Sequence, residues 1–228
     1  RPEKPKNRLT DMAHPWQHRR QKRIDPVIDR ALDSPSRENL NALVANAGRQ
    51  PTKLAERVRR RAANLAQNAP GQSETLLRSR DQLLQRLYAA EATGYLTAWS
   101  DAAVFPDRSA VGIGGLLADI DGQTLAEFSI QRQDGDAVVS EIAAATHTVD
   151  LAIACGTQRL RLHTDCAALV ELWCCKRHDA RLQPLVTVSR SIKLMLREVP
   201  RLHNQRANWL ARRSFESGVP PQPSLSPT

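Results

Sequence analysis

Apolar residues recur at helical spacing through most of the first 94 residues. Leucine, valine and alanine side chains three and four positions apart define amphipathic segments at 33–48, 50–67 and 73–94, which predict three helices. A Pro/Gly-containing loop at 68–72 separates the second helix from the third. Residues 1 to about 25 lack this periodicity, so we expect them to be mobile or ordered only on binding.

From residue 95 onward the chain changes to short apolar runs that are typical of strands. The elements predicted in order are strands at 95–105, 109–120 and 124–132, a helix at 138–156, a strand at 159–164, and helices at 167–173, 182–199 and 206–217. An Asp-Gly pair between the second and third strands is a strong tight-turn signal. Three strands in a meander, followed by a helix and a strand, indicate a mixed α/β sheet with helices on its faces.

Charge is distributed unevenly along the chain, whose net charge is +9. Residues 1–72 hold 16 Lys and Arg against 7 Asp and Glu, whereas residues 73–228 hold 17 of each. A basic arm next to a neutral domain favours a polyanionic partner, most often nucleic acid. We predict that the consecutive Arg59, Arg60 and Arg61 contact substrate. The arm could instead dock onto a partner protein, or be a solvated tail.

The cysteines and the apolar runs exclude other classes of site. The four cysteines lack the spacing of a zinc site, and we expect them to be reduced thiols in a cytoplasmic protein. No apolar run approaches membrane-spanning length, so we expect no membrane partner. The glycine-rich run at 112–115 continues into a strand rather than a helix, which excludes a dinucleotide-binding loop. Gly114 therefore either contacts a substrate backbone or makes room for a helix packed on the sheet.

The positions of three carboxylates can each be explained by local structure, but together they suggest a cation site. Asp165 can cap the helix that follows it, and Glu141 can compensate a helix dipole in the first turn of its helix. Asp101 lies in a strand interior, where a carboxylate is costly unless it is paired, hydrated or bound to a cation. If the first and fourth strands are neighbours, all three converge and repel one another unless divalent cations lie among them. Mg²⁺ favours such oxygen ligands.

Several motifs occur in a family-specific order. They are WSDAA (99–103), GIGGLL (112–117), SEIAAATHTVDLAI (140–153), LHTDC (162–166) and HNQRANWLA (203–211). Through them, residues 95–213 resemble the ribonuclease H family. The resemblance covers about half of the chain and implies a five-stranded mixed sheet, an antiparallel three-strand meander plus parallel strands, flanked by helices. The basic helical N-terminal extension resembles no hybrid-binding module of the family.

The resemblance implies an endonuclease that hydrolyses the RNA strand of RNA–DNA hybrids with two Mg²⁺, or Mn²⁺, ions per site. By motif position, Asp101, Glu141 and Asp165 correspond to the metal-binding carboxylates. Asn208 stands where the family usually has the fourth, and we count it with them as a candidate catalytic and metal-binding residue. An amide offers a carbonyl oxygen but no charge, so we expect weaker occupancy of one metal position and lower activity. Asn204 matches a family position that orients a loop or touches substrate.

An alternative is a catalytically weak or inactive nucleic-acid-binding protein that acts with a partner, for which Asn208 is the main support. The leucine stripe at 76–88 packs on the next domain or on another copy, and the role of His203 stays open. The organisation predicted is a basic, partly disordered helical region at 1–72, a connecting helix at 73–94, a ribonuclease H-like domain at 95–216 and a disordered tail at 217–228.

Overall fold

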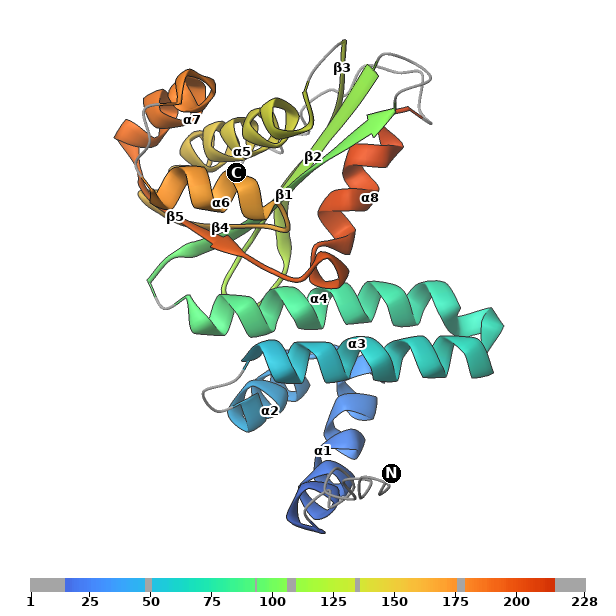
Figure 1. The fold of residues 1–228 in the computed structure, drawn as a ribbon. Coiled ribbons are helices and arrows are strands. Elements are labelled where there is room, and N and C mark those ends of the chain that lie inside the picture. The colour runs from blue at the N-terminus through green and yellow to red at the C-terminus, as the bar shows by residue number, and fades with distance from the viewer. Residues whose placement is uncertain are drawn as a thin grey trace, which may run out of the picture.

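A five-stranded sheet is built from the second half of the chain, and four helices precede it (Figure 1). The computed structural model describes residues 15–47, 51–92, 94–105, 110–133, 136–175 and 179–215, so the tail predicted at 217–228 lies outside it. The elements are α1 (Pro15–Asp33), α2 (Arg37–Ala47), α3 (Pro51–Asn68), the 3-10 turn η1 (Pro70–Gln72), α4 (Ser73–Glu91), β1 (Leu96–Phe105), β2 (Ala110–Ala118), β3 (Thr124–Gln133), α5 (Ala137–Ala154), β4 (Arg159–Thr164), α6 (Ala167–Cys174), η3 (Ala180–Leu182), α7 (Gln183–Val188), η4 (Ser189–Ser191), β5 (Lys193–Glu198), η5 (Arg201–His203) and α8 (Gln205–Arg213).

The strands lie in the order β3-β2-β1-β4-β5. β1, β2 and β3 form the antiparallel meander, while β4 pairs parallel with both β1 and β5. This confirms the mixed sheet and the contact between the first and fourth strands. The tight turn between β2 and β3 contains Gly122, whose φ of 78° is costly for any residue with a side chain.

The helix predicted at 182–199 is wrong, because its second half is a strand. α7 ends at Val188, and β5 pairs with β4 from Lys193 to Glu198. The run Lys-Leu-Met-Leu-Arg-Glu is made of good helix formers, which is why local propensity favours a helix there. An open parallel edge on β4 overrides that preference, since pairing satisfies the backbone of both strands.

α5 is the core helix on one face of the sheet. The Asp136 side chain caps it by accepting from the backbone N–H groups of Val138 and Val139. With 18 residues and a mean hydropathy of 1.3, it is long and apolar enough to cross a membrane, so the expectation that no run approaches that length is wrong. Its buried apolar residues pack on β1, β2 and β4, however, as those of a core helix do.

α8 covers the opposite face of the sheet, and the glycines of β2 explain how it fits (Figure 1). A methyl group on Gly114 would overlap the backbone nitrogen of Ala211 and come within 2.7 Å of Leu210. Gly115 points the other way, toward Thr148 of α5. Helix packing therefore accounts for Gly114, and its predicted contact with substrate stays a prediction.

The N-terminal helices share one hydrophobic core with the α8 face of the sheet. α1 begins at Pro15, so the chain is helical from that residue onward, where the sequence showed no helical periodicity before about residue 25. That this segment is mobile, or ordered only on binding, stays a prediction. The buried members of the leucine stripe on α4 pack against this face of the sheet within the same chain. The core contains Ile28, Leu32, Leu40, Leu43, Val58, Leu83, Leu87, Trp99, Leu116 and Leu210, among others. The segments predicted as 1–72, 73–94 and 95–216 thus all contribute to it.

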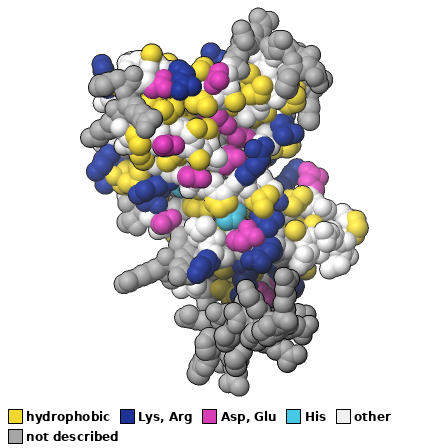
Figure 2. Space-filling model, in the orientation of Figure 1, with side chains coloured by type: hydrophobic (Ala, Val, Ile, Leu, Met, Phe, Trp, Pro, Cys, Tyr) yellow, Lys and Arg dark blue, Asp and Glu magenta, His cyan; other side chains and the backbone are white. Residues whose placement is uncertain are grey.

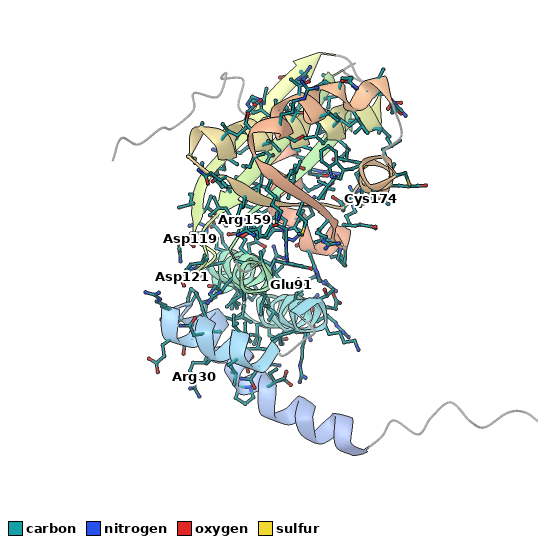
Figure 3. All side chains as sticks on the ribbon, turned by 90° about the vertical axis from the view of Figure 1, so that its left-hand side faces the viewer. Arg30, Glu91, Asp119, Asp121, Arg159 and Cys174 are labelled. Atoms are coloured by element: carbon teal, nitrogen blue, oxygen red, sulfur yellow. The ribbon has the colours of Figure 1, made fainter. Side chains whose placement is uncertain are left out.

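The turn between β2 and β3 also contacts these helices. Asp121 lies 3.6 Å from Arg37 of α2 and 3.8 Å from Arg86 of α4, and Figure 3 shows it, with Asp119, where the sheet meets the N-terminal helices. The packed core and these ion pairs together fix the helices relative to the sheet.

Replacing Gly114 by alanine tests the packing of α8. We expect Gly114→Ala to lower the free energy of unfolding by about 1–3 kcal/mol, because the added methyl group has no space. Gly71→Ala is the control, since nothing lies within 4 Å of a methyl group there. Urea unfolding curves of both variants would measure the difference, and equal stability would contradict the packing described.

Candidate active site

Two buried aspartates meet at the junction of β1 and β4. Asp101 lies in the middle of β1 and is 2% exposed, and Asp165 directly follows the last residue of β4, with its side chain 8% exposed. Glu141 joins them from α5, where it interacts with Asp101 and the backbone of Ala102. Figure 2 shows acidic side chains gathered in the middle of the upper part of the visible face. The convergence predicted for the three carboxylates is therefore present.

The ordinary explanations for two of these carboxylates do not hold. Glu141 is the fifth residue of α5 and lies beyond the first turn, which Asp136 caps. Asp165 does not cap α6: the N-cap position before Ala167 is Cys166, and no side chain makes a capping hydrogen bond there. The hydroxyl of Thr164 accepts from the Cys166 N–H instead. Neither the capping alternative for Asp165 nor the helix-dipole alternative for Glu141 is therefore supported, which leaves the cluster of Asp101, Glu141 and Asp165 as the explanation.

Burial and mutual repulsion shift the titration of the cluster. Burial, followed by the charge of Asp165, raises the pKa of Asp101 to about 7, although the hydrogen bond from Asn208 acts in the opposite direction. Burial also raises the pKa of Glu141 to about 9, with the charges of Asp101 and Asp165 adding to the shift. Glu141 therefore holds a proton at neutral pH, and Asp101 holds one in part of the molecules, whereas ordinary carboxyls release theirs.

Asn208 is held between the cluster and an arginine of its own helix. Its side-chain nitrogen donates to Asp101 Oδ2 at 2.6 Å, and its carbonyl oxygen accepts from Arg212 Nε at 3.0 Å. Because a guanidinium can only donate, Arg212 fixes the amide with its nitrogen toward Asp101. Asn208 thus serves as a hydrogen-bond donor to the cluster, and its carbonyl oxygen is engaged elsewhere.

Asn204 holds the other aspartate. Its side-chain nitrogen donates to Asp165 Oδ1 at 2.5 Å and to the backbone oxygen of Ser100 at 2.9 Å, and Asn204 itself is 1% exposed. The exposed Arg201 lies 3.7 Å from Asp165 Oδ2. These contacts tie the segment before α8 to both β1 and the end of β4.

The carboxylates suit a hard divalent cation better than the amide does. Glu141 Oε2 is buried without a hydrogen-bond partner, and the repulsion that raises the pKa of Glu141 is the kind a cation would relieve. No three His, Cys, Asp or Glu side chains among the described residues already enclose a common point as metal ligands. The carboxylates of Asp101, Glu141 and Asp165 are thus chemically suited to hold a cation. The side-chain carbonyl of Asn208 is less suited, because it already accepts a hydrogen bond from Arg212.

The three predicted substrate-binding arginines lie on α3 in different environments. Arg59 makes two hydrogen bonds to Glu56, at 2.8 and 2.9 Å, and Arg61 makes two to Asp29 of α1, at 2.6 and 2.7 Å. Arg60 is 3.2 Å from Glu56, and its side chain is 68% exposed. Of the three, Arg60 is the most accessible, and their contact with substrate stays a prediction.

His203 is a residue whose place could not be inferred from sequence. It is buried between the N-terminal helices and the site, with Nδ1 2.7 Å from the Tyr88 hydroxyl and Nε2 3.3 Å from Glu56 Oε2. Burial lowers the pKa of His203, so the ring is neutral and the Glu56 carboxylate, which only accepts, places the proton on Nε2. Tyr88 then donates to Nδ1. In the sequence, the one sign of the contact between Glu56 and His203 is that Glu56 is a lone acidic residue among the arginines of α3.

Comparisons with known proteins match the half of the chain that carries the sheet. The sequence model of a family described as reverse transcriptase-like matches residues 100–214. Ribonuclease H1 from the halophilic archaeon Halobacterium salinarum superposes with a TM-score of 0.50 at 20% identity, over 54% of this chain and 98% of that one. The N-terminal ribonuclease H domain of a Mycobacterium tuberculosis protein gives 0.49 at 17% identity, over 54% and 95%. No curated protein matches the chain.

The matched segment begins one residue before Asp101 and includes Glu141, Asp165 and Asn208. It also covers β2 to β5 and α5 to α8, and so nearly all of the sheet and its covering helices. At 20% identity the likeness to the archaeal structure shows the fold alone, which is the mixed five-stranded sheet described above. This chain belongs to the reverse transcriptase-like family and has a ribonuclease H-like fold.

Proposed function

We propose that the protein is an endonuclease that hydrolyses the RNA strand of RNA–DNA hybrids with the help of divalent cations. The observation that carries the proposal is the convergence of three carboxylates at the junction of β1, α5 and β4: the buried Asp101 and the largely buried Glu141 and Asp165. Membership of the family and the ribonuclease H-like fold support a nuclease. The choice of hybrid as substrate follows the motif resemblance of residues 95–213.

In this proposal, Asp101, Glu141 and Asp165 hold Mg²⁺ or Mn²⁺. When bound, such a cation activates water for attack on a phosphodiester and stabilises charge on the departing oxygen. Asn208 orients Asp101 through the 2.6 Å hydrogen bond, and Asn204 orients Asp165 through the 2.5 Å one. Discrimination for RNA would come from contacts to the 2′-hydroxyl and from groove shape.

The number of cations depends on Asn208. The resemblance implies two ions per site, and the second would need a ligand from α8. The only oxygen that Asn208 offers accepts a hydrogen bond from Arg212, and it brings no charge to compete for a cation. We therefore propose that one ion binds strongly and the second weakly, so that the reaction is slower than with a carboxylate at position 208.

The substrate would reach the site along basic side chains. Arg201 is 70% exposed and lies beside Asp165, and Arg60 on α3 is 68% exposed. Both are suited to phosphate oxygens, which dominate nucleic-acid affinity without reading sequence. Arg59 and Arg61 would first have to leave their paired carboxylates, so we expect a smaller contribution from them.

A second candidate is a nucleic-acid-binding protein that has kept the fold and lost the reaction, acting with a partner. The amide at position 208 favours it, because a donor faces Asp101 where a further metal-ligating oxygen would otherwise lie. The position of Asp101 inside a strand, beside Glu141 and Asp165, argues against it, because the hydrogen bonds from Asn208 and Asn204 offset only part of the cost of placing these groups together.

Cleavage of labelled hybrid separates the two candidates. We expect hybrid-specific cleavage in Mg²⁺ or Mn²⁺, with matched single-stranded RNA, double-stranded RNA and double-stranded DNA left intact. Asp165→Asn should lower the rate about a thousandfold, because a metal ligand contributes several kcal/mol to the transition state. Asp150→Asn, on the exposed face of α5, is the control and should cleave normally. Binding of hybrid without cleavage in either metal would favour the second candidate.

Restoring the carboxylate tests the role of Asn208. Asn208→Asp replaces a donor by a charged oxygen ligand, so we expect it to tighten binding of a second Mn²⁺ and to raise the rate of hybrid cleavage by about tenfold or more. Calorimetric titration with Mn²⁺ would give the stoichiometry, with the exposed Asn64→Asp on α3 as the control. An unchanged stoichiometry and rate would refute the proposed role.

The raised carboxyl pKa values predict how stability varies with pH in the cation-free protein. Because the pKa of Glu141 rises from 4.5 to about 9, the folded state binds more protons than the unfolded state up to that pH. The free energy of unfolding should therefore fall as pH rises from 7 to 9, by at most about 1.4 kcal/mol per pH unit for each proton. Below this window the lowered pKa of His163 acts in the opposite sense.

Urea unfolding at pH 7, 8 and 9 would measure this slope. Glu141→Gln should flatten it, and millimolar Mg²⁺ or Mn²⁺ should restore stability at pH 9 by binding the ionised cluster. Stability that is level or increasing over this range in the cation-free protein would show that Glu141 is already ionised at pH 7.

A further inference from the structure

The four N-terminal helices end at Glu91 and so lie outside the segment that matches a known family, which begins at residue 100. We propose that these helices help to position the candidate site. Glu56 of α3 contacts His203, and through His203 it positions the segment before α8 whose Asn204 holds Asp165. The activity readout of this inference rests on the proposed function, but its structural readout does not.

The first link joins α3 to the turn before α8. Glu56 Oε2 lies 3.3 Å from His203 Nε2, and the Tyr88 hydroxyl of α4 lies 2.7 Å from Nδ1. Both ring nitrogens are therefore engaged by the N-terminal helices. The His203 side chain is 1% exposed, so water cannot readily replace these partners.

The second link runs from this turn to the carboxylates. Asn204 follows His203 directly and bridges the backbone oxygen of Ser100 on β1 and the Asp165 carboxylate. A shift of His203 would move the backbone of Asn204 with it. Sub-ångström displacement of such a residue matters, because the geometry of a metal ligand depends on its hydrogen-bond partners.

The turn itself provides little rigidity. η5 is three residues long, and its local backbone hydrogen bonds are His203 N–H to Pro200 and Asn204 N–H to Arg201. A single 3-10 turn of this kind is readily deformed. The side-chain contacts of His203 with the N-terminal helices therefore add to those of Asn204 in holding the turn in one position.

The contact between Glu56 and His203 also gives two arginines of α3 a structural role. Arg59 donates twice to Glu56, and Arg60 lies 3.2 Å from the same carboxylate. Together they fix the Glu56 side chain in the orientation that meets His203. Part of the positive charge of this helix thus serves the positioning of Glu56, whatever Arg60 contributes to binding nucleic acid.

Hydrogen exchange and kinetics on full-length variants test the inference. In Glu56→Ala we expect amide exchange in residues 199–208 to accelerate about tenfold, the loss expected for one charge-assisted hydrogen bond. The kcat for hybrid cleavage should fall by a similar factor while KM does not rise. Glu56→Gln, whose amide oxygen can still accept from His203 Nε2, should recover part of both losses.

Two further variants make the outcome specific. Glu74→Ala, which removes an exposed partner of Arg78 on α4, is the matched control and should change neither measurement. In an Asn204→Ala background, Glu56→Ala should lower kcat no further, because the link to Asp165 is already cut. Unchanged exchange in residues 199–208 of folded Glu56→Ala would overturn the inference, as would additive effects in the double variant.

The exchange measurement stands apart from the activity. If the wild-type protein cleaves no hybrid in either metal, the proposed function fails, and exchange in residues 199–208 still decides whether Glu56 holds the turn. A rise in KM without faster exchange would instead identify Glu56 and its arginines as substrate contacts and would contradict positioning through His203.

Discussion

Asp101, Glu141 and Asp165 lie beside one another and repel when they are charged. Strand pairing and amide hydrogen bonds hold two of them in place against this repulsion. Asp101 cannot leave the cluster, because it is in the middle of a paired strand, and Asp165 is set by the end of the neighbouring strand. Amides face both of them, from Asn208 and Asn204. Hydrogen-bond donors lower the cost of each charge, but the pKa values of Asp101 and Glu141 remain raised. A positively charged ligand would relieve the repulsion that remains.

The helical N-terminal region and the sheet are joined by packing as well as by hydrogen bonds. One core runs from α1 to α4 and continues onto the α8 face of the sheet, while a second core lies under α5 on the other face. One side of α8 presents Asn208 to Asp101, and Leu210 and Ala211 on another side pack over Gly114. Displacing the N-terminal helices would therefore expose the inner face of the helix that orients Asp101. The N-terminal helices are therefore an integral part of the structural unit that contains the candidate site.

Sequence patterns predicted the features that depend on local chemistry. The meander, the tight turn at Gly122 and the convergence of Asp101, Glu141 and Asp165 all follow from periodicity and motif order. The resemblance implies a fifth strand, but the local pattern predicts a helix over the residues that form it. Pairing with β4 outweighs the helix propensity of these residues, and such a partner cannot be recognised in a local window.

Features set by long-range contacts could not be predicted in the same way. Whether Asn208 offers its oxygen or its nitrogen to the cluster depends on the local contact with Arg212 together with the contact with Asp101, which is 107 positions away. The contact between Glu56 and His203 joins residues 147 positions apart, and a basic helix face gave a stronger and different signal. The arginines of α3 were predicted from charge alone, yet their carboxylate partners come from α3 itself and from α1.

The most direct test of this account is the number of protons released when the cluster binds a cation. Titration of the protein with Mn²⁺ at pH 7, in two buffers of different ionisation enthalpy, gives that number by calorimetry. Because the pKa of Glu141 is about 9 and that of Asp101 about 7, we predict release of about one proton or more per chain. Binding without proton release, or no binding at millimolar Mn²⁺, would contradict a protonated carboxylate cluster that a cation ionises.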